Sequence, residues 1–191
     1  IVLFEGVNTW FNRINHYGTK AGFLVEHYII SSGMREIIKS TSIADEFKRI
    51  YACRYYYDET HTATWPAQVV NYTAKTQYIF RINKQVLDVN DDADLNKYVP
   101  QIERPIPFER MIYIADGLTD VPCMRLVKEY GGKSIAVYSS NNAVAKSLKD
   151  VGRVNYIAKA DYSSGSEMEQ IVQSILDHMK ADEVLKKYEE K

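Results

Sequence analysis

Apolar positions repeat along this chain with two periods, which predict helices in some segments and strands in others. In the first half the patterns predict, in order, a helix over 7–18, a strand over 25–30, a helix over 34–39, strands over 49–57 and 63–72, and a helix over 74–87. Pro66 interrupts the second of the paired strands, so we expect a β-hairpin with a bulge or an edge strand. Thr73 is a candidate N-cap for the helix that follows.

The second half alternates strictly between the two patterns. It predicts a strand over 111–115, a helix over 120–130, a strand over 134–138, a helix over 142–149, a strand over 154–157 and a helix over 164–180. Such alternation indicates parallel strands with right-handed crossovers. We therefore expect an α/β fold over residues 1–181, a three-layer Rossmann-like and mostly parallel sheet with a small hairpin insertion. The charged tail 182–191 is expected to fray.

Composition narrows the class of protein. The 191 residues are 46% hydrophobic and 26% charged, as in soluble globular proteins. With 24 basic and 25 acidic residues and no clustered basic face, a nucleic-acid partner is not expected. No apolar run is long enough to span a membrane. Cys53 and Cys123 lie far apart and suggest neither a disulfide framework nor a zinc site, so we expect two small core residues and a reducing, cytoplasmic location.

The segment 111–122 carries the most informative candidate chemistry, because an apolar strand runs into a turn that contains two carboxylates. Open α/β sheets bind their ligands at the carboxyl ends of the strands, where Asp116 is expected. Mg²⁺ is usually held by one or two carboxylates together with substrate phosphate and water. Asp120 could cap the next helix, orient the site or bind the ion as a second ligand. The alternative, ordinary turn and cap chemistry, is equally compatible with this segment alone.

Two further places could bind a phosphate. Ser31 and Ser32 stand where a predicted strand meets a helix, and the backbone N–H groups of a helix start favour anions. A serine that merely caps this helix is the simpler alternative. Lys75 lies one turn into its predicted helix, from which an ammonium group could reach the strand ends as a point charge. Lys84, nine residues later on the same helix, is the competing candidate.

These three pieces, in this order, resemble the haloacid-dehalogenase-like (HAD) superfamily of phosphohydrolases, and specifically its phosphoserine-phosphatase-like branch. The segment 29–33 looks like the family's second motif, a strand ending in Ser before a Gly-containing turn. Lys75 looks like the lysine of the third motif. The segment 115–120 looks like the fourth, a strand followed by Gly-Asp-Gly and a second Asp. The resemblance covers nearly the whole chain.

The resemblance implies a role for each of these residues. Asp116 would hold Mg²⁺, and Asp120 would orient the site or bind the ion directly. Ser31 and the N–H group of Ser32 would hold phosphoryl oxygens. Lys75 would neutralise charge on the phosphate and on the nucleophile.

The chain departs from the family pattern in two ways. Ala115 stands where the family usually has Gly. The first motif, Asp-x-Asp-x-Thr/Val on the leading strand, which supplies the nucleophile and the general acid, does not occur, and the acidic stretch 88–94 follows the wrong helix. The resemblance therefore implies that the first strand and much of a cap precede Ile1.

The leading hypothesis is a Mg²⁺-dependent phosphomonoesterase that acts on a small phosphorylated substrate through an aspartyl-phosphate, with its nucleophile upstream of this chain. By itself the chain is expected to be inactive. The alternative is a non-catalytic HAD-like interaction or regulatory module, and a cation-pumping ATPase domain is a more distant possibility. The aromatic segment 51–57 and its hairpin could form a flap over the site, but packing against the core is the favoured expectation.

Overall fold

The computed structural model describes residues 1–189, which form two compact units. Unit 1 contains residues 1–25, 108–117 and the chain from Met124 on. Unit 2 contains residues 26–107 and 118–123. Each unit has its own three-stranded sheet, and the two are described separately.

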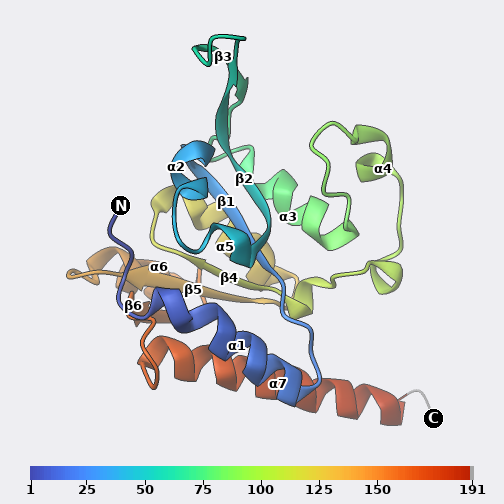
Figure 1. The fold of residues 1–191 in the computed structure, drawn as a ribbon. Helices are drawn as coiled ribbons and strands as arrows, with labels where there is room; N and C mark the ends of the chain where they lie inside the picture. Colours follow the sequence, from blue (N-terminus) through green and yellow to red (C-terminus); the bar gives the residue numbers. More distant parts are fainter. Residues whose placement is uncertain (190–191) are drawn as a thin grey trace. The chain divides into compact units, whose positions relative to one another are not determined.

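The sheet of unit 1 is entirely parallel. Its strands are β4 (Ile112–Ala115), β5 (Lys133–Tyr138) and β6 (Tyr156–Lys159), in the order β4-β5-β6. Figure 1 labels the three strands, and the residue pairing shows no shift of register in either pair. The four inner residues of the central strand β5 are buried, as expected for a strand covered on both faces.

The helices of unit 1 follow the predicted periods. They are α1 (Val7–Ala21), α5 (Val121–Glu129, whose first residues belong to unit 2), α6 (Ala143–Asp150) and α7 (Glu167–Glu189). The stripe Trp10, Phe11 and Ile14 on α1 is buried, and α1 packs against α7. Helix α7 continues through residues 182–189 of the tail that was expected to fray, and residues 190–191 lie outside the described chain.

The sheet of unit 2 is mixed. Its strands are β1 (His27–Met34), β2 (Phe47–Tyr57) and β3 (Ala63–Gln68); β1 and β2 are parallel, whereas β2 and β3 form an antiparallel hairpin. The helices of this unit are α2 (Arg35–Lys39), α3 (Lys75–Lys84) and α4 (Asp92–Asn96). Short 3-10 helices over 44–46, 101–103, 108–110 and 118–120 complete the described secondary structure.

Several predicted boundaries in unit 2 are corrected by the structure. β1 does not stop at Ile30 but continues to Met34, and the helix after it has only five residues. Thr73 does not cap α3, since its hydroxyl donates to the side-chain oxygen of Asn71, which also accepts from the N–H of Ala74. The acidic stretch 88–94 runs into the short helix α4, which the apolar pattern did not predict.

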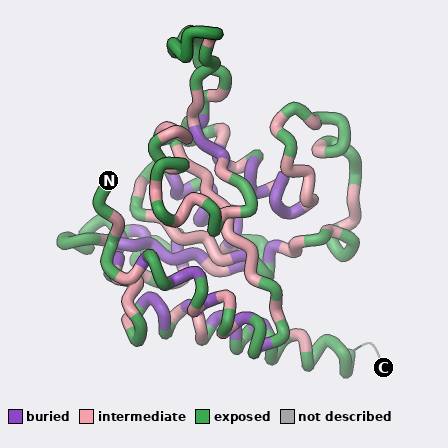
Figure 2. The backbone as a smooth tube through the Cα atoms, in the orientation of Figure 1, coloured by how far each residue is buried: buried purple, intermediate pink, exposed green. Residues whose placement is uncertain are grey.

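The hairpin differs from the expectation of packing against the core. Tyr51, at the start of the aromatic segment, is buried and stacks on Tyr78, with 4.5 Å between the two ring centroids. Farther along, Tyr56 and its cross-strand partner Trp65 are 63% and 72% exposed, and Figure 2 shows the end of the hairpin as exposed. The packing expectation therefore holds only at the base of the hairpin.

The architecture as a whole is α/β with mostly parallel strands, in agreement with the expected class and compatible with a Rossmann-like arrangement. Within residues 1–189, no helix combines the length and the apolar character that a bilayer crossing requires.

Candidate functional site

A buried ion pair joins two of the predicted site residues. Lys75, the first residue of α3, places its Nζ 2.8 Å from Oδ1 of Asp120 and 3.5 Å from the hydroxyl oxygen of Thr119. Both charged residues are buried, at 4% and 6% exposure. Charges removed from water in this way are tolerated only when they are paired and hydrogen-bonded. The competing candidate, Lys84, instead donates to the backbone carbonyls of Leu95 in α4 and of Lys97, which directly follows that helix.

The ion pair bears on what Asp120 can do. A carboxylate that already accepts from an ammonium group is a poor direct ligand for Mg²⁺, because the cation would lie beside a second positive charge. Asp120 also precedes α5 directly, so its position is fixed by the helix start. This arrangement favours Asp120 as the residue that holds Lys75 in place over a role as a second metal ligand.

Ser31 and Ser32 lie in an irregular part of β1. The register with β2 is interrupted between Ile30 and Met34, so both serines and Gly33 have no paired residue in β2. Bulges of this kind often occur beside active sites, where they redirect a side chain. The hydroxyl of Ser31 accepts from the N–H of Gly33 at 3.0 Å. Because α2 has no side-chain cap, the alternative in which a serine caps this helix is wrong.

Asp116 occupies the carboxyl edge of the sheet in unit 1. It follows the last residue of β4, is exposed, and has no hydrogen bond or ion pair to another residue in the range 1–189. An unpaired carboxylate at this edge is the group that a hard cation prefers.

Tyr162 lies near Asp116 and was not predicted from the sequence. Its pKa is raised by burial and, to a smaller extent, by the negative charge of Asp116. The ring packs edge-on against Trp10 at 5.1 Å, and its backbone N–H donates to the carbonyl of Glu5 at 2.9 Å. Tyr162 follows β6, so its place at the carboxyl edge of a parallel sheet was the one signal that could have identified it.

The donor groups fit magnesium only in part. No cluster of three His, Cys, Asp or Glu side chains suited to a metal occurs in the described chain. A single free carboxylate is nevertheless compatible with Mg²⁺, which keeps several waters and takes further oxygens from a substrate phosphate. Of the residues present, Asp116 is the one that would hold the ion.

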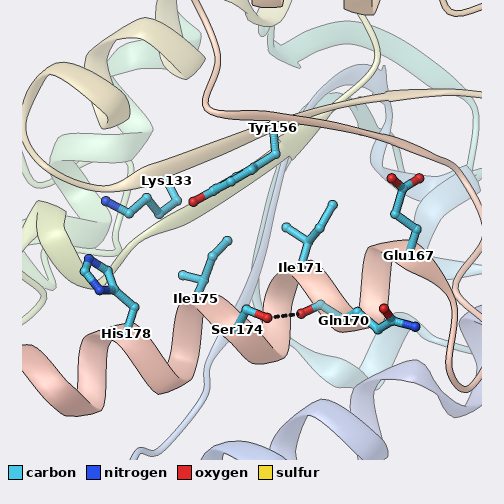
Figure 3. Close-up of a pocket in the computed structure, with 8 residues that line it drawn as sticks. All are labelled: Lys133, Tyr156, Glu167, Gln170, Ile171, Ser174, Ile175 and His178. Carbon is cyan, nitrogen blue, oxygen red and sulfur yellow. Dashed lines mark hydrogen bonds between the residues drawn. The ribbon is translucent and has the colours of Figure 1, made fainter.

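A groove of about 340 Å³ lies in unit 1, and none of the predicted site residues lines it. Figure 3 shows it between α7 and the first residues of β5 and β6. Its lining residues are Lys133, Tyr156, Glu167, Gln170, Ile171, Ser174, Ile175 and His178. Since ligands of open α/β sheets bind at the carboxyl ends of the strands, a groove at the amino ends is not the expected active site.

The structure therefore brings Lys75, Thr119 and Asp120 together and places the two serines in the same unit, whereas Asp116 belongs to the other unit.

The comparisons with known proteins identify one relative. No family model matches the chain. An uncharacterized protein of Borreliella burgdorferi is 29% identical over 185 residues, which cover 86% of this chain and 63% of the relative. The chain thus spans less than two thirds of the length of the relative it matches, and the match carries no statement about activity.

Proposed function

We propose that the whole protein is a Mg²⁺-dependent phosphomonoesterase of the HAD type that acts on a small phosphorylated substrate. The observation that carries the proposal is the buried ion pair between Lys75 and Asp120. In the sequence, Asp120 lies four residues after Asp116, an unpaired carboxylate at a strand end. Two buried charges cost solvation free energy that a purely structural contact would avoid by apolar packing. Their retention supports a role in binding a charged substrate.

In this proposal each residue has one task. Asp116 would hold Mg²⁺, which polarises a phosphoryl oxygen when bound. The hydroxyl of Ser31, which keeps its own proton to donate, would hydrogen-bond a phosphoryl oxygen together with the N–H of Ser32. Lys75, oriented by Asp120, would place a positive charge beside the phosphate.

The nucleophile of the proposed reaction lies outside residues 1–191. The pair Asp92 and Asp94 belongs to α4, and Asp92 is paired with Arg81, so these carboxylates do not stand at a strand end. The proposed aspartyl-phosphate would therefore form on an Asp of the leading strand in the full-length protein. Both cysteines are free thiols, as a reducing compartment would keep them, and a cytoplasmic location is part of the proposal.

The test is hydrolysis of p-nitrophenyl phosphate by the full-length protein with and without Mg²⁺. We expect hydrolysis that depends on Mg²⁺ and that falls by about 100-fold or more in Asp116→Asn, the usual cost of losing one charge-stabilising group. Asp94→Asn, an exposed acid on α4, is the matched control and should retain activity. Activity that ignores both Mg²⁺ and Asp116→Asn would contradict the proposal.

The second candidate is a non-catalytic HAD-like interaction or regulatory module. It is favoured by one observation, the lack of an Asp-x-Asp-x-Thr/Val sequence in this chain. A full-length protein that binds inorganic phosphate through Ser31 and Lys75 but hydrolyses no ester would support this second candidate.

A further inference from the structure

The groove beside α7 is built entirely by unit 1 and has the size of a small-molecule site. Its volume of about 340 Å³ lies within the range of roughly 300 to 1,000 Å³ that is usual for ligand pockets. Glu167, Ile171, Ser174 and His178 follow one another at spacings of three and four residues, so they line one flank of α7. From the first to the last of them the helix rises by about 16 Å, which sets the length of the groove.

The other side of the groove is the start of two neighbouring strands. Tyr156, the first residue of β6, is paired with Ile135 of β5. Lys133, the first residue of β5, lies two positions before Ile135. Because side chains alternate between the two faces of a sheet, Lys133 and Tyr156 project from the same face. Both line the groove, so this face of the sheet lies opposite α7.

Two hydrogen-bond donors meet at one end of the groove. Figure 3 shows the ammonium group of Lys133 and the hydroxyl of Tyr156 at this end, with the imidazole of His178 below them. The Nζ of Lys133 donates to the carbonyl of Gly131 at 3.4 Å and forms no ion pair within residues 1–189. The hydroxyl of Tyr156 makes no hydrogen bond in the part of the chain that the structure describes. Both groups can therefore donate to a ligand.

The charge at this end is positive. Lys133 contributes one ammonium group, and the ammonium group of Lys149 lies 5.7 Å from the centroid of the Tyr156 ring. Asp182 contributes one carboxylate, whose Oδ2 lies 3.5 Å from Nε2 of His178. Two positive charges against one negative leave a net charge of +1, without counting the imidazole. This charge fits a singly charged carboxylate better than a doubly charged phosphate.

The middle and the far end of the groove have a different chemistry. Ile171 and Ile175 form the apolar stretch between the two ends (Figure 3). Glu167 lies at the far end and is exposed, and its carboxylate makes no hydrogen bond or ion pair with any residue from 1 to 189. It would repel a negative group of a ligand at that end. The groove is thus positive at one end, apolar along its middle and negative at the other end.

We propose that this groove binds a monocarboxylic acid with an apolar chain. The carboxylate lies at Lys133 and Tyr156, and the chain covers the two isoleucines. Glu167 excludes a second acid at the far end of the chain. The inference does not rest on the proposed function, because Asp116 follows the carboxyl end of β4, whereas the groove lies at the amino ends of β5 and β6.

The test compares three probes with the same eight-carbon chain. Octanoate carries one acid, octan-1-ol replaces that acid by a neutral hydroxyl, and octanedioate carries an acid at each end. Their dissociation constants are measured by calorimetry on the full-length protein at pH 7 and low ionic strength. We expect octanoate to bind about ten-fold more tightly than the alcohol, which lacks the charged acceptor. It should bind about three-fold more tightly than the diacid, which meets Glu167 near the surface.

Variants then locate the two ends of the ligand. Lys133→Gln should weaken octanoate binding by about ten-fold and change that of octan-1-ol little. Lys133→Arg keeps the charge and should retain most of the affinity, which also shows that a change at this position is tolerated. Lys180→Gln is the matched control, since it removes the same charge from an exposed position of α7 that does not line the groove. Glu167→Gln should bring the affinity for octanedioate close to that for octanoate.

Three results would each overturn the inference: no binding of octanoate, equal affinity for octanoate and octan-1-ol, or equal losses in Lys133→Gln and Lys180→Gln. Tighter binding of octanedioate than of octanoate would reject the role of Glu167 and the monocarboxylic class. These failures are distinguishable from failure of the proposed function, because Asp116→Asn should bind octanoate like the unmodified protein. Octanoate binding by a protein that hydrolyses no phosphate ester would leave the inference intact.

Discussion

The two sheets of this protein have three strands each but are stabilised by different kinds of contact. In unit 1 the strands keep a continuous parallel register, and the interior of β5 is buried throughout. In unit 2 the register is interrupted in both strand pairs. Of the six buried polar or charged residues in the range 1–189, four belong to this unit, namely Lys75, Arg81, Asn83 and Asp120, against Ser134 and Glu169 in unit 1.

The difference has a physical consequence. Apolar packing is non-directional, so the stability of unit 1 is spread over many contacts of moderate value. A buried polar contact is directional and is expensive to leave half-made. Arg81, for example, is 1% exposed and donates to the backbone carbonyls of Asp88, Val89 and Asp91, which fixes the loop after α3. Unit 2 therefore depends on a few single residues, and the candidate Lys75–Asp120 pair is one of them.

Among tests of this difference, Lys75→Met should have the largest effect on the free energy of unfolding. It removes the ammonium group that pairs with the buried carboxylate of Asp120, so we expect the free energy of unfolding to fall by about 3 kcal/mol or more, measured by urea denaturation at pH 7. Lys75→Met combined with Asp120→Leu removes both charges and should recover most of the loss.

The exposed pair Arg125–Glu129 is the control, since its side chains are 65% and 53% exposed. Arg125→Met should change the stability by less than about 0.5 kcal/mol. If Lys75→Met and Arg125→Met lower the free energy of unfolding by the same amount, buried polar contacts do not distinguish unit 2 from unit 1.

A smaller effect is expected from acid. Burial lowers the pKa of His27 on β1 from 6.5 to about 4. Between these two values the unfolded chain binds a proton that the folded unit does not, so stability decreases as the pH falls through this window. From pH 7 to pH 5 the loss from this residue is about 2 kcal/mol.

His27→Gln should remove this part of the pH dependence. The measurement is urea denaturation of both proteins at pH 7 and pH 5, with His178→Gln, an exposed histidine of unit 1, as the control. If the stability of His27→Gln falls between pH 7 and pH 5 by as much as that of the unmodified protein, another group controls the acid response.

The ion pair between Arg13 and Glu169 in unit 1 should contribute less to the free energy of unfolding than the Lys75–Asp120 pair of unit 2. Burial opposes ionisation of Glu169, but hydrogen bonds from Arg13 and from the N–H of Gly165 outweigh it, and the pKa of this carboxyl is lowered. Glu169→Gln keeps the size of the side chain and weakens both bonds, so we expect a loss of about 1 to 2 kcal/mol at pH 7.

Because the folded pKa of Glu169 is lowered, its contribution is present above the unfolded value near 4.5 and is lost as the pH falls below it. Thermal unfolding at pH 7 and pH 3.5 would show the variant and the unmodified protein converging in acid. A loss in Glu169→Gln as large as that in Lys75→Met would remove the distinction between the units.

The same contrast explains how much of the fold was predictable. In unit 1 the spacing of Trp10, Phe11 and Ile14 predicted α1, and strict alternation predicted its parallel strands, because apolar burial leaves a periodic pattern in the sequence. In unit 2 the five-residue helix α4 escaped prediction, since it is held by single polar contacts such as Arg81 with Asp92. Such contacts have no period.

The candidate site was predictable in its residues but not in its contacts. Ser31, Lys75 and Asp120 could be singled out because each stands near a strand or helix end. The 2.8 Å contact between Lys75 and Asp120 joins residues 45 positions apart, and only the folded chain determines it.

A small effect on stability is expected at the end of the hairpin in unit 2. Trp65 is 72% exposed and faces Tyr56 across the strand pair, so Trp65→Ala removes one cross-strand contact worth about 0.5 kcal/mol. A tryptophan packed in a core would cost about 3 to 5 kcal/mol on the same change. The other tryptophan, Trp10, is 5% exposed, so quenching of the fluorescence by iodide should report on Trp65 and disappear in the variant. A large loss of stability, or fluorescence that iodide does not reach, would show that the hairpin is covered in solution and that unit 2 has more apolar packing than its exposed side chains indicate.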